Sequence, residues 1–465
     1  MTVGYVSTRD PGSADRQGNG LGFGDVLLAG LAPDGGLYCP TEIPALPDIG
    51  ADTGYVEAAV RIFEPFTAGT FTADELAPMA AAAYGSFRDP LVCPVVDLGH
   101  GRHLLDLTRG PTLAFKDVAL QMVGRMLEAE LDRRGERVTV IGATSGDTGS
   151  AAIEALAGAS NIDVMILHPK GRVSEVQRRQ MTTVTASNIH NVAIEGTFDD
   201  CQDLVKASFA DPELRTTAKL AAVNSINWAR VMCQIVYYVT SARTGRPDGG
   251  PVSFSVPTGN FGNVLSGWYA KRMGLAIDRL VVASNRNDVL TRFFETGTLT
   301  THEVSPSLSP SMDIQISSNF ERLLWEASGR DGAAVAELIA TLREDGQAEV
   351  PGEWYQAILD DFDGDRLDDD GTLERIEQTL ARAELVVDPH TAVGLHAAER
   401  ADTAVPMIAL ATADPAKFPD AVQRATGIRP ELPGHLSEIM TRPERYETLP
   451  NHLDPVAERL RSLSR

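Results

Sequence analysis

The sequence predicts an α/β protein built on mostly parallel sheets, with a small N-terminal domain and a helical insertion. Three observations support this fold class. From Val95 onward, short apolar runs alternate with amphipathic helical segments. The first ninety or so residues are instead rich in turns, and residues 319–389 contain helical segments without strand-like runs. Continuous apolar strands separated by helices are typical of parallel sheets that are covered on both faces.

The expected strands share a short apolar core that ends near Gly, Pro or a small polar residue. They are VTVIGA (138–143), VMILHP (164–169), NVAIEG (191–196), VSFSVP (252–257), RLVVAS (279–284) and PMIALAT (406–412). We expect domain boundaries at 1–94 for the N-terminal unit, 95–430 for an α/β region of two subdomains, and 431–465 for a tail of turns and a short amphipathic helix.

The acidic segment DDFDGDRLDDDGT lies inside the helical insertion at residues 360–372. It invites an EF-hand interpretation, but Arg366 stands where the sharp turn needs Gly, and Thr372 stands where a bidentate Glu belongs. We therefore expect a solvated acidic loop.

Charge and hydropathy exclude several classes of protein. Lys and Arg number 41 against 64 Asp and Glu, which gives a net charge of -23. Such an acidic chain repels phosphate backbones and anionic lipid, so we expect neither nucleic acid nor a membrane as a partner. No apolar run approaches the roughly 20 residues of a membrane span, and the first residues lack signal-peptide features. We expect a cytoplasmic protein, monomeric in preference to dimeric.

Cysteine and histidine spacing gives no metal site. The cysteines are scattered and form no CxxC pair, so we expect buried free thiols at Cys39, Cys93, Cys201 and Cys233. His100 and His103 lack further nearby ligands, and we expect them at the surface. His390 follows Asp388 and Pro389 at an expected helix start, where capping or packing is the favoured role over catalysis.

Two loops follow expected strands and precede expected helices. The first, PTGNFGN, spans residues 257–263, and its Gly259 and Gly262 would let the main chain approach a ligand. Free amides and the positive end of a helix dipole suit a phosphate there. The second, TSGDTG at 144–149, repeats the arrangement for a phosphate or carboxylate. Ordinary strand-to-helix turns and helix capping are the alternatives.

Lys116 is the lysine best placed for chemistry among the six in the chain. It stands beside apolar residues at the start of an amphipathic helix, where burial would lower its pKa and make it a nucleophile or base. A Schiff-base lysine needs those properties. A solvated helix-start lysine is the alternative, and Lys417, flanked by prolines in an expected loop, is the rival.

Several longer segments of the sequence match known signature segments and occur in the same order along the chain. GPTLAFKD, TSGDTG, NSIN, PTGNFGN and SPSMDIQISSNFERLL resemble the signature segments of the threonine synthase family, and YVSTRD with GLAPDGGLYCP resembles its N-terminal domain. The resemblance runs from about residue 3 to about residue 426. It implies a pyridoxal 5'-phosphate enzyme of fold type II, the tryptophan-synthase-β-like fold.

By this resemblance, Lys116 carries the cofactor. The residues implied to hold the cofactor phosphate through backbone amides are Gly259, Asn260, Phe261, Gly262 and Asn263. Thr412 would face the pyridine nitrogen, where a hydroxyl moderates the electron demand of the ring. Asp147 would lie near the 3-hydroxyl group.

The same resemblance implies the substrate and the reaction. O-phospho-L-homoserine would be held by Ser145, Thr148, Asn224, Ser225 and Arg230, and would react with water to give L-threonine and phosphate. Two departures occur, because Arg109 and Asp414 stand where the family often has His. Two other activities stay open: a fold-type II enzyme acting on serine-like substrates, and a silent phospho-ligand binder.

Overall fold

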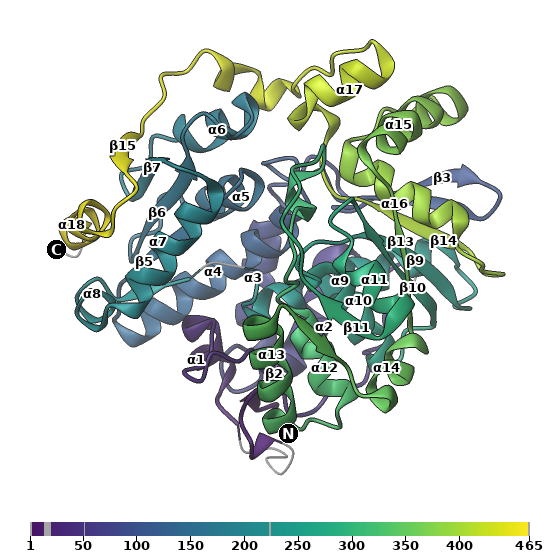
Figure 1. The fold of residues 1–465 in the computed structure, drawn as a ribbon, viewed down its shortest axis with the longest axis horizontal. Coiled ribbons are helices and arrows are strands. Elements are labelled where there is room, and N and C mark those ends of the chain that lie inside the picture. Colours follow the sequence, from purple (N-terminus) through teal and green to yellow (C-terminus); the bar gives the residue numbers. More distant parts are fainter. Residues whose placement is uncertain (1, 14–19, 51, 223–224, 464–465) are drawn as a thin grey trace.

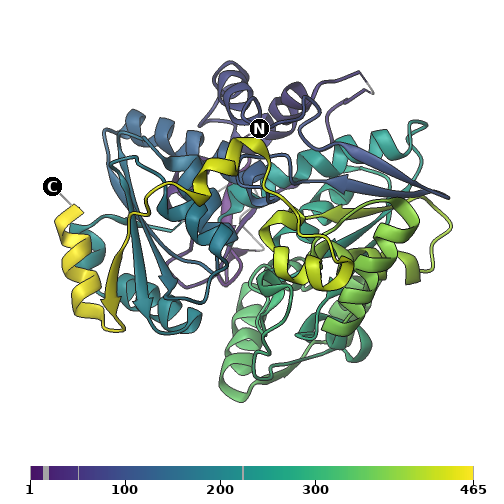
Figure 2. The ribbon, with the colours of Figure 1, turned by 90° about the horizontal axis from the view of Figure 1, so that it is seen from above.

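The computed structural model describes residues 2–13, 20–50, 52–222 and 225–463. Two sheets form two lobes that face each other, a five-stranded sheet toward the left of Figure 1 and a six-stranded sheet toward its right. Figure 2 shows the same separation from above, with the C-terminal helix on the outer side of the five-stranded sheet. The predicted α/β class with mostly parallel sheets is confirmed.

The five-stranded sheet has the order β15-β7-β6-β5-β8, and its recorded pairings are parallel. Its strands are β5 (Val138–Ala143), β6 (Ile162–Pro169), β7 (Ile189–Glu195), β8 (Leu220–Ala221) and β15 (Glu447–Pro450). Its helices are α5 (Asp147–Leu156), α6 (Glu175–Thr182), α7 (Phe198–Ala210), α8 (Pro212–Thr217) and α18 (Leu453–Leu463). The central strand β6 is almost wholly buried, as its apolar run predicts.

The six-stranded sheet has the order β13-β10-β9-β14-β4-β3, and β3 alone among its described strands runs antiparallel to its neighbour. Its strands are β3 (Val95–Gly99), β4 (Arg102–Asp106), β9 (Val252–Pro257), β10 (Ile277–Ser284), β13 (Phe362–Arg366) and β14 (Met407–Ala411). The surrounding helices are α9 (Trp228–Gly245), α10 (Gly262–Met273), α11 (Val289–Thr296), α15 (Asp369–Ala383), α16 (Pro389–Arg400) and α17 (Pro419–Thr426).

The N-terminal part packs against both lobes through one shared core. It contains β1 (Tyr5–Ser7), α1 (Phe23–Ala29), β2 (Tyr38–Pro40), α2 (Tyr55–Thr67) and α3 (Ala73–Tyr84). The fully buried Trp228 ring of α9 lies 6.1 Å from the Tyr5 ring and 5.7 Å from the Phe66 ring. Helix α4 (Lys116–Arg134) is buried along most of its length. Its first residue, Lys116, is therefore held by a rigid helix.

The expectation that residues 319–389 lack strands is wrong. Helices α12 (Phe320–Ala327), α13 (Gly332–Asp345) and α14 (Gly352–Leu359) are present, but β12 (Gln347–Glu349) pairs with β11 (Thr298–Thr300). In addition, β13 is the edge strand of the six-stranded sheet beside β10. These strands are short and polar, so periodicity in the sequence does not reveal them.

The acidic segment is likewise not a solvated loop. It contains β13, whose Phe362 is fully buried, and the start of α15, which Asp368 caps by accepting a hydrogen bond from the Gly371 amide. Its carboxylates have basic partners, with Asp361 2.6 Å from the Lys271 ammonium and Asp365 2.9 Å from the Arg400 guanidinium. Charge pairing with neighbouring elements lets an acidic run form an edge strand.

The C-terminal tail contains the expected turns and amphipathic helix, and also a strand that the sequence did not reveal. After the short helix η4 (Gly434–Met440), β15 extends the five-stranded sheet beside β7. Helix α18 then buries Val456 and Leu460 against that lobe. The domain boundaries at 94 and 430 stay predictions.

Two simpler expectations concern the cysteines and membranes. All four cysteines are free and buried, as predicted. Over the ranges that the structure describes, no helix is both long and apolar enough to span a bilayer.

Candidate active site

A cavity of about 150 Å³ lies at the carboxyl ends of β5, β9 and β14, where the two lobes meet. Ligand sites of open α/β sheets occur at such strand ends. Twelve of the predicted site residues line it: Lys116, Ser145, Asp147, Thr148, Ser225, Arg230, Gly259, Asn260, Phe261, Gly262, Asn263 and Thr412. The thirteenth, Asn224, lies outside the described residues. The tertiary structure thus brings together groups that are almost 300 positions apart in the chain.

The loop between β9 and α10 presents backbone amides to this cavity. Phe261 adopts a left-handed conformation (φ 62°), which is costly for a bulky residue and turns the chain sharply into α10. A Cβ on Gly259 would lie 2.5 Å from the Ser311 carbonyl oxygen, so only Gly fits. In the described chain the amides of Gly262, Asn263 and Val264 have no hydrogen-bond partner. Together with the helix dipole, they form a site for an anion.

The loop between β5 and α5 is partly closed by its own side chains. The Thr144 hydroxyl accepts hydrogen bonds from the Gly146 and Gly149 amides, both at 2.9 Å. The first residue of α5 is Asp147, which is buried. The capping alternative therefore accounts for part of this loop, and a carboxylate occupies the first position of the same helix.

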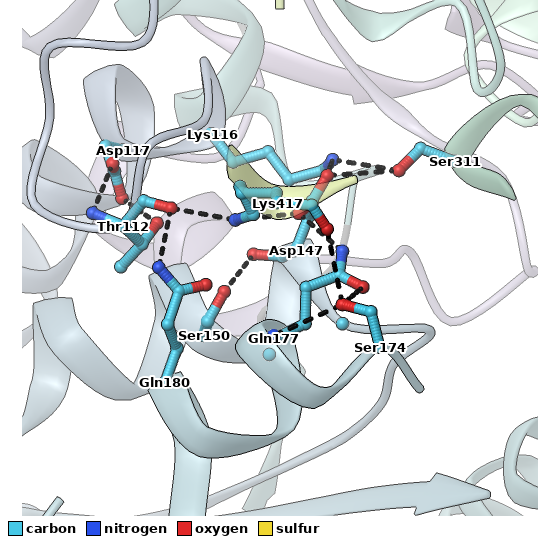
Figure 3. Close-up of polar contacts among 12 residues, drawn as sticks. Thr112, Lys116, Asp117, Asp147, Ser150, Ser174, Gln177, Gln180, Ser311 and Lys417 are labelled. Carbon is cyan, nitrogen blue, oxygen red and sulfur yellow. Dashed lines mark hydrogen bonds and ion pairs between the residues drawn. The ribbon is translucent and has the colours of Figure 1, made fainter. Parts of the chain in front are cut away.

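Lys116 directs its amine at this carboxylate from the start of α4 (Figure 3). Its Nζ lies 3.1 Å from Asp147 Oδ2 and 3.4 Å from Ser311 Oγ. Burial lowers the pKa of Lys116, an effect that the Asp147 charge opposes and the Lys417 and Arg230 charges reinforce. Lys116 is therefore the buried amine of lowered pKa that the sequence predicted, and a solvated helix-start lysine is excluded.

Asp147 is bound by a second lysine and an amide. Lys417 Nζ and Gln177 Nε2 each lie 2.8 Å from Asp147 Oδ1. Burial alone would raise the pKa of Asp147, but the charges of Lys116 and Lys417 hold it well below its usual range. The carboxylate is thus ionised and fixed in orientation.

Lys417 lies in the short helix η3 (Pro415–Lys417) rather than in the loop that its flanking prolines suggested. Its side chain is fully buried and also donates to the Thr112 carbonyl oxygen at 2.8 Å. It does not line the cavity, whereas Lys116 does. The geometry therefore favours Lys116 over Lys417 as the reactive amine.

Arg230 is a buried cation that forms no ion pair with any carboxylate of the described residues. It is only 3% exposed, and within the same residues its Nε and Nη1 atoms have no hydrogen-bond partner. Burial lowers the pKa of its guanidinium. Nearby on α10, Asn263 Nδ2 is also unpartnered, while its Oδ1 accepts hydrogen bonds from Tyr237 and Tyr238 at 2.6 and 2.9 Å. Unpaired buried donors facing a cavity point to an anionic ligand.

Thr412 lies beside the start of α4 because backbone hydrogen bonds connect the segment that follows β14 to the segment that precedes α4. The Phe115 amide donates to the Thr412 carbonyl oxygen at 3.0 Å, and Ala114 forms an isolated bridge with Ala413. Leu113, at the entry to this segment, has a left-handed backbone (φ 66°). This strained turn brings the end of β14 to the start of α4.

Two groups that contact this site received no site role from the sequence: Ser311, which was not singled out, and His390, for which capping or packing was favoured over catalysis. The Ser311 hydroxyl donates to Asp147 Oδ2 at 3.2 Å, and its amide donates to His390 Nε2 at 3.3 Å. His390 lines the cavity, although it also begins α16 as expected, with its Nδ1 2.6 Å from Asp388 Oδ2. The segment SPSMDIQISS, which contains Ser311, resembles a family signature, but the resemblance assigned no role to that serine.

The two departures from the family pattern lie away from the cavity lining. Arg109 is half-exposed and pairs with Asp106 at 2.7 Å. Asp414 caps η3 by accepting a hydrogen bond from the Ala416 amide at 2.9 Å, and burial raises its pKa.

In the described part of the chain, no group of three His, Cys, Asp or Glu side chains could hold a metal ion.

Comparison with known proteins identifies the family. Residues 4–84 match the family Threonine synthase N terminus, residues 98–344 match Pyridoxal-phosphate dependent enzyme, and residues 391–459 match Threonine synthase, C-terminal. A threonine synthase of Pseudomonas aeruginosa is 49% identical, over 97% of this chain and 97% of that protein. The chain belongs to the threonine synthase family.

Solved structures of the threonine synthase family share the whole fold. A pyridoxal-phosphate-bound threonine synthase of Brucella melitensis is 49% identical, with a TM-score of 0.94 and coverage of 100% of both chains. A yeast threonine synthase is 37% identical, with a TM-score of 0.92, over 99% of this chain and 98% of that one. The expected fold type II architecture of pyridoxal-phosphate enzymes is confirmed.

Proposed function

We propose that this chain converts O-phospho-L-homoserine and water to L-threonine and phosphate, with pyridoxal 5'-phosphate as cofactor. Membership of the threonine synthase family supports the activity. One structural observation carries the proposal for the site. A single cavity contains a buried amine of lowered pKa, the Gly262 and Asn263 amides and a buried arginine, and neither these amides nor the arginine Nε and Nη1 atoms have a hydrogen-bond partner among the described residues. This set of groups suits one aldehyde-bearing cofactor phosphate and one substrate phosphate.

The residues present fit the cofactor. The free amides at the start of α10 would hold its phosphate, Lys116 would bind its aldehyde carbon, and Thr412 would face its ring nitrogen. Bound there, the cofactor supplies an electron sink for the pair that is released when the substrate loses its α proton. A hydroxyl at the ring nitrogen, instead of a carboxylate, moderates that electron demand.

Lys116 is the proposed proton carrier. When its amine is displaced by the substrate amine, burial keeps it unprotonated more readily than an exposed lysine, so Nζ can take the proton from Cα. Its anchor at the start of the buried helix α4 keeps Nζ within reach of the reacting carbons.

The substrate contacts are a second part of the proposal. Arg230 would bind the substrate phosphate, because its unpartnered donors gain charge-assisted hydrogen bonds there. Ser145, Thr148 and Ser225 line the same cavity and would bind the remaining oxygens, with Asn224. A proton would then leave Cβ and phosphate would leave Cγ, Cγ would take up a proton, and water would add as hydroxide at Cβ and as a proton at Cα, which completes the reaction.

The deciding experiment is an assay of the cofactor-loaded protein with O-phospho-L-homoserine. Phosphate release and the amino-acid product are measured in the same reaction. We expect equal amounts of phosphate and L-threonine. Phosphate accompanied by 2-ketobutyrate would instead indicate a lyase that adds no water, and release of keto acid from serine without any need for phosphate would favour a serine-type enzyme.

Lys116→Ala tests the assigned amine. We expect turnover to fall by about 10³-fold or more, because both cofactor attachment and proton transfer are lost. The fold should persist, since Ala favours a helix and Lys116 lies at the first residue of α4. Circular dichroism provides the control for folding. Turnover close to that of the unmodified protein would contradict the role.

A further inference from the structure

Three charged side chains form a buried group beside the cavity, here called the lysine–aspartate cluster: Lys116, Asp147 and Lys417 (Figure 3). The two lysines bind different oxygens of the same carboxylate, Lys116 at Oδ2 and Lys417 at Oδ1. The cluster therefore has one cation more than it has anions. One lysine is enough to neutralise a single carboxylate, so the charge of Asp147 alone does not explain the second lysine.

The two lysines differ in how firmly the protein holds their ammonium groups. Lys417 is fully buried, donates to the Thr112 carbonyl oxygen and does not line the cavity. Lys116 lines the cavity and has a long second contact of 3.4 Å to Ser311 Oγ. Lys417 is thus fixed by the protein, whereas Lys116 can turn toward a ligand.

Other charges around the cluster do not replace Lys417. The charged and titratable groups around the cluster include His390 and Arg230, whose charges act on Asp147 and Lys116, and Asp117 and Asp414, on which the charge of Lys417 acts. His390 is already bonded to Asp388, and Arg230 has no hydrogen bond to Asp147. When Lys116 leaves, Lys417 is the remaining lysine on this carboxylate.

We propose that Lys417 is a positioning residue that serves as the permanent counter-ion of Asp147, which frees Lys116 to leave the ion pair and react. The inference rests on the proposed function, because it concerns the amine that binds the cofactor. Without Lys417, the carboxylate would keep Lys116 as its sole lysine partner. The amine of Lys116 would then hold its proton to a higher pH.

The test is the pH dependence of cofactor attachment to the apoprotein. The unprotonated amine adds to the aldehyde carbon of pyridoxal phosphate and water leaves, so the rate follows the unprotonated fraction of Lys116. The rate is followed by visible absorbance, and borohydride reduction with peptide mapping identifies the lysine that is modified. We compare the unmodified protein with Lys417→Met and with Lys170→Met, a matched control at an exposed ion pair with Glu195.

We expect Lys417→Met to move the midpoint of the pH–rate profile up by about one unit, a rate about tenfold lower at neutral pH. Lys417→Arg restores the cation and should return the midpoint toward that of the unmodified protein, and Lys170→Met should leave it unchanged. An unchanged midpoint in Lys417→Met, with the adduct still on Lys116, would overturn this inference alone. Absence of any adduct on Lys116 in the unmodified protein would overturn the proposed function as well.

If Lys417→Met does not bind the cofactor, a stability measurement still tests the inference. In the unmodified background, Lys417→Met should lower the melting temperature, because it removes half of the ion pairing of Asp147. In an Asp147→Asn background, the same change should raise the melting temperature, since it removes an unpaired buried cation. A decrease of similar size in both backgrounds would show that Lys417 only fills space, and would overturn the inference.

Discussion

The two helix starts at the cavity, those of α5 and α10, look alike in sequence but differ in charge. Both follow a parallel strand through a glycine-containing loop. At α5, Thr144 caps two amides and Asp147 occupies the first helical position. At α10, no acidic residue lies in the first turn, no side chain caps the helix, and three amides are unpartnered in the described structure.

This difference assigns opposite electrostatic roles to similar loops. The α10 start has the positive end of the helix dipole and free donors, which favour a phosphate. The α5 start presents a carboxylate, which favours the ammonium groups of Lys116 and Lys417. A glycine-rich strand-to-helix turn therefore does not define a phosphate site until the charge of the first helical turn is known.

The largest expected effect comes from making α10 resemble α5. Gly262→Asp would place a carboxylate at the start of α10, where like-charge repulsion opposes the cofactor phosphate. We expect the dissociation constant of pyridoxal phosphate to rise by about 10³-fold. The measurement is a titration of the apoprotein followed by visible absorbance.

Gly262→Ala is the matched control for this change. The nearest atoms to an added Cβ there are Asn319 Nδ2 at 3.3 Å and the Ser225 carbonyl oxygen at 3.7 Å, so a methyl group requires only a small adjustment. It should weaken cofactor binding by less than about tenfold. Equal losses for Ala and Asp would show that space, and not charge, distinguishes the two helix starts.

A somewhat smaller effect is expected at the buried arginine. Arg230→Met should lower kcat/KM for O-phospho-L-homoserine by about 10²-fold, because the phosphate loses charge-assisted hydrogen bonds. It should also raise the free energy of unfolding by roughly 1 to 3 kcal/mol, because unpartnered buried donors are removed. Steady-state kinetics and thermal unfolding check the two effects.

Arg230→Lys keeps the charge but lacks the planar pair of donors. Its kcat/KM and its free energy of unfolding should lie between those of Arg230→Met and those of the unmodified protein. The cofactor affinity is a second control, since the proposal assigns Arg230 to the substrate. A loss of cofactor binding as large as the loss of kcat/KM would instead place Arg230 at the cofactor phosphate.

The smallest expected effect is a shift along the pH axis. Asp147 raises the pKa of Lys116 against the effect of burial, so Asp147→Asn should lower that pKa further. The unprotonated amine then persists to lower pH, and the midpoint of cofactor attachment should move down by about one unit. A shift upward, or none, would contradict the ion pair as the control on this amine.

The fold was largely predictable, but some strands were not. Six apolar runs predicted the strands β5, β6, β7, β9, β10 and β14, because a buried parallel strand must be apolar on both faces. Strands β13 and β15 were missed, since both are edge strands with half-exposed, polar sequences. Their formation depends on a neighbour that already presents free backbone groups.

For the site, local sequence determined which residues could react: a lysine between apolar residues and a helix, and glycine turns after strands. Whether Lys116 keeps its proton, whether a helix start is open to an anion and whether Arg230 has a partner were decided by the tertiary structure alone. The reason is that desolvation and Coulomb energies depend on distances between elements that lie far apart in the chain. Lys417, 301 positions after Lys116 by their residue numbers, shows this directly, because its charge reaches Asp147 only in the folded protein.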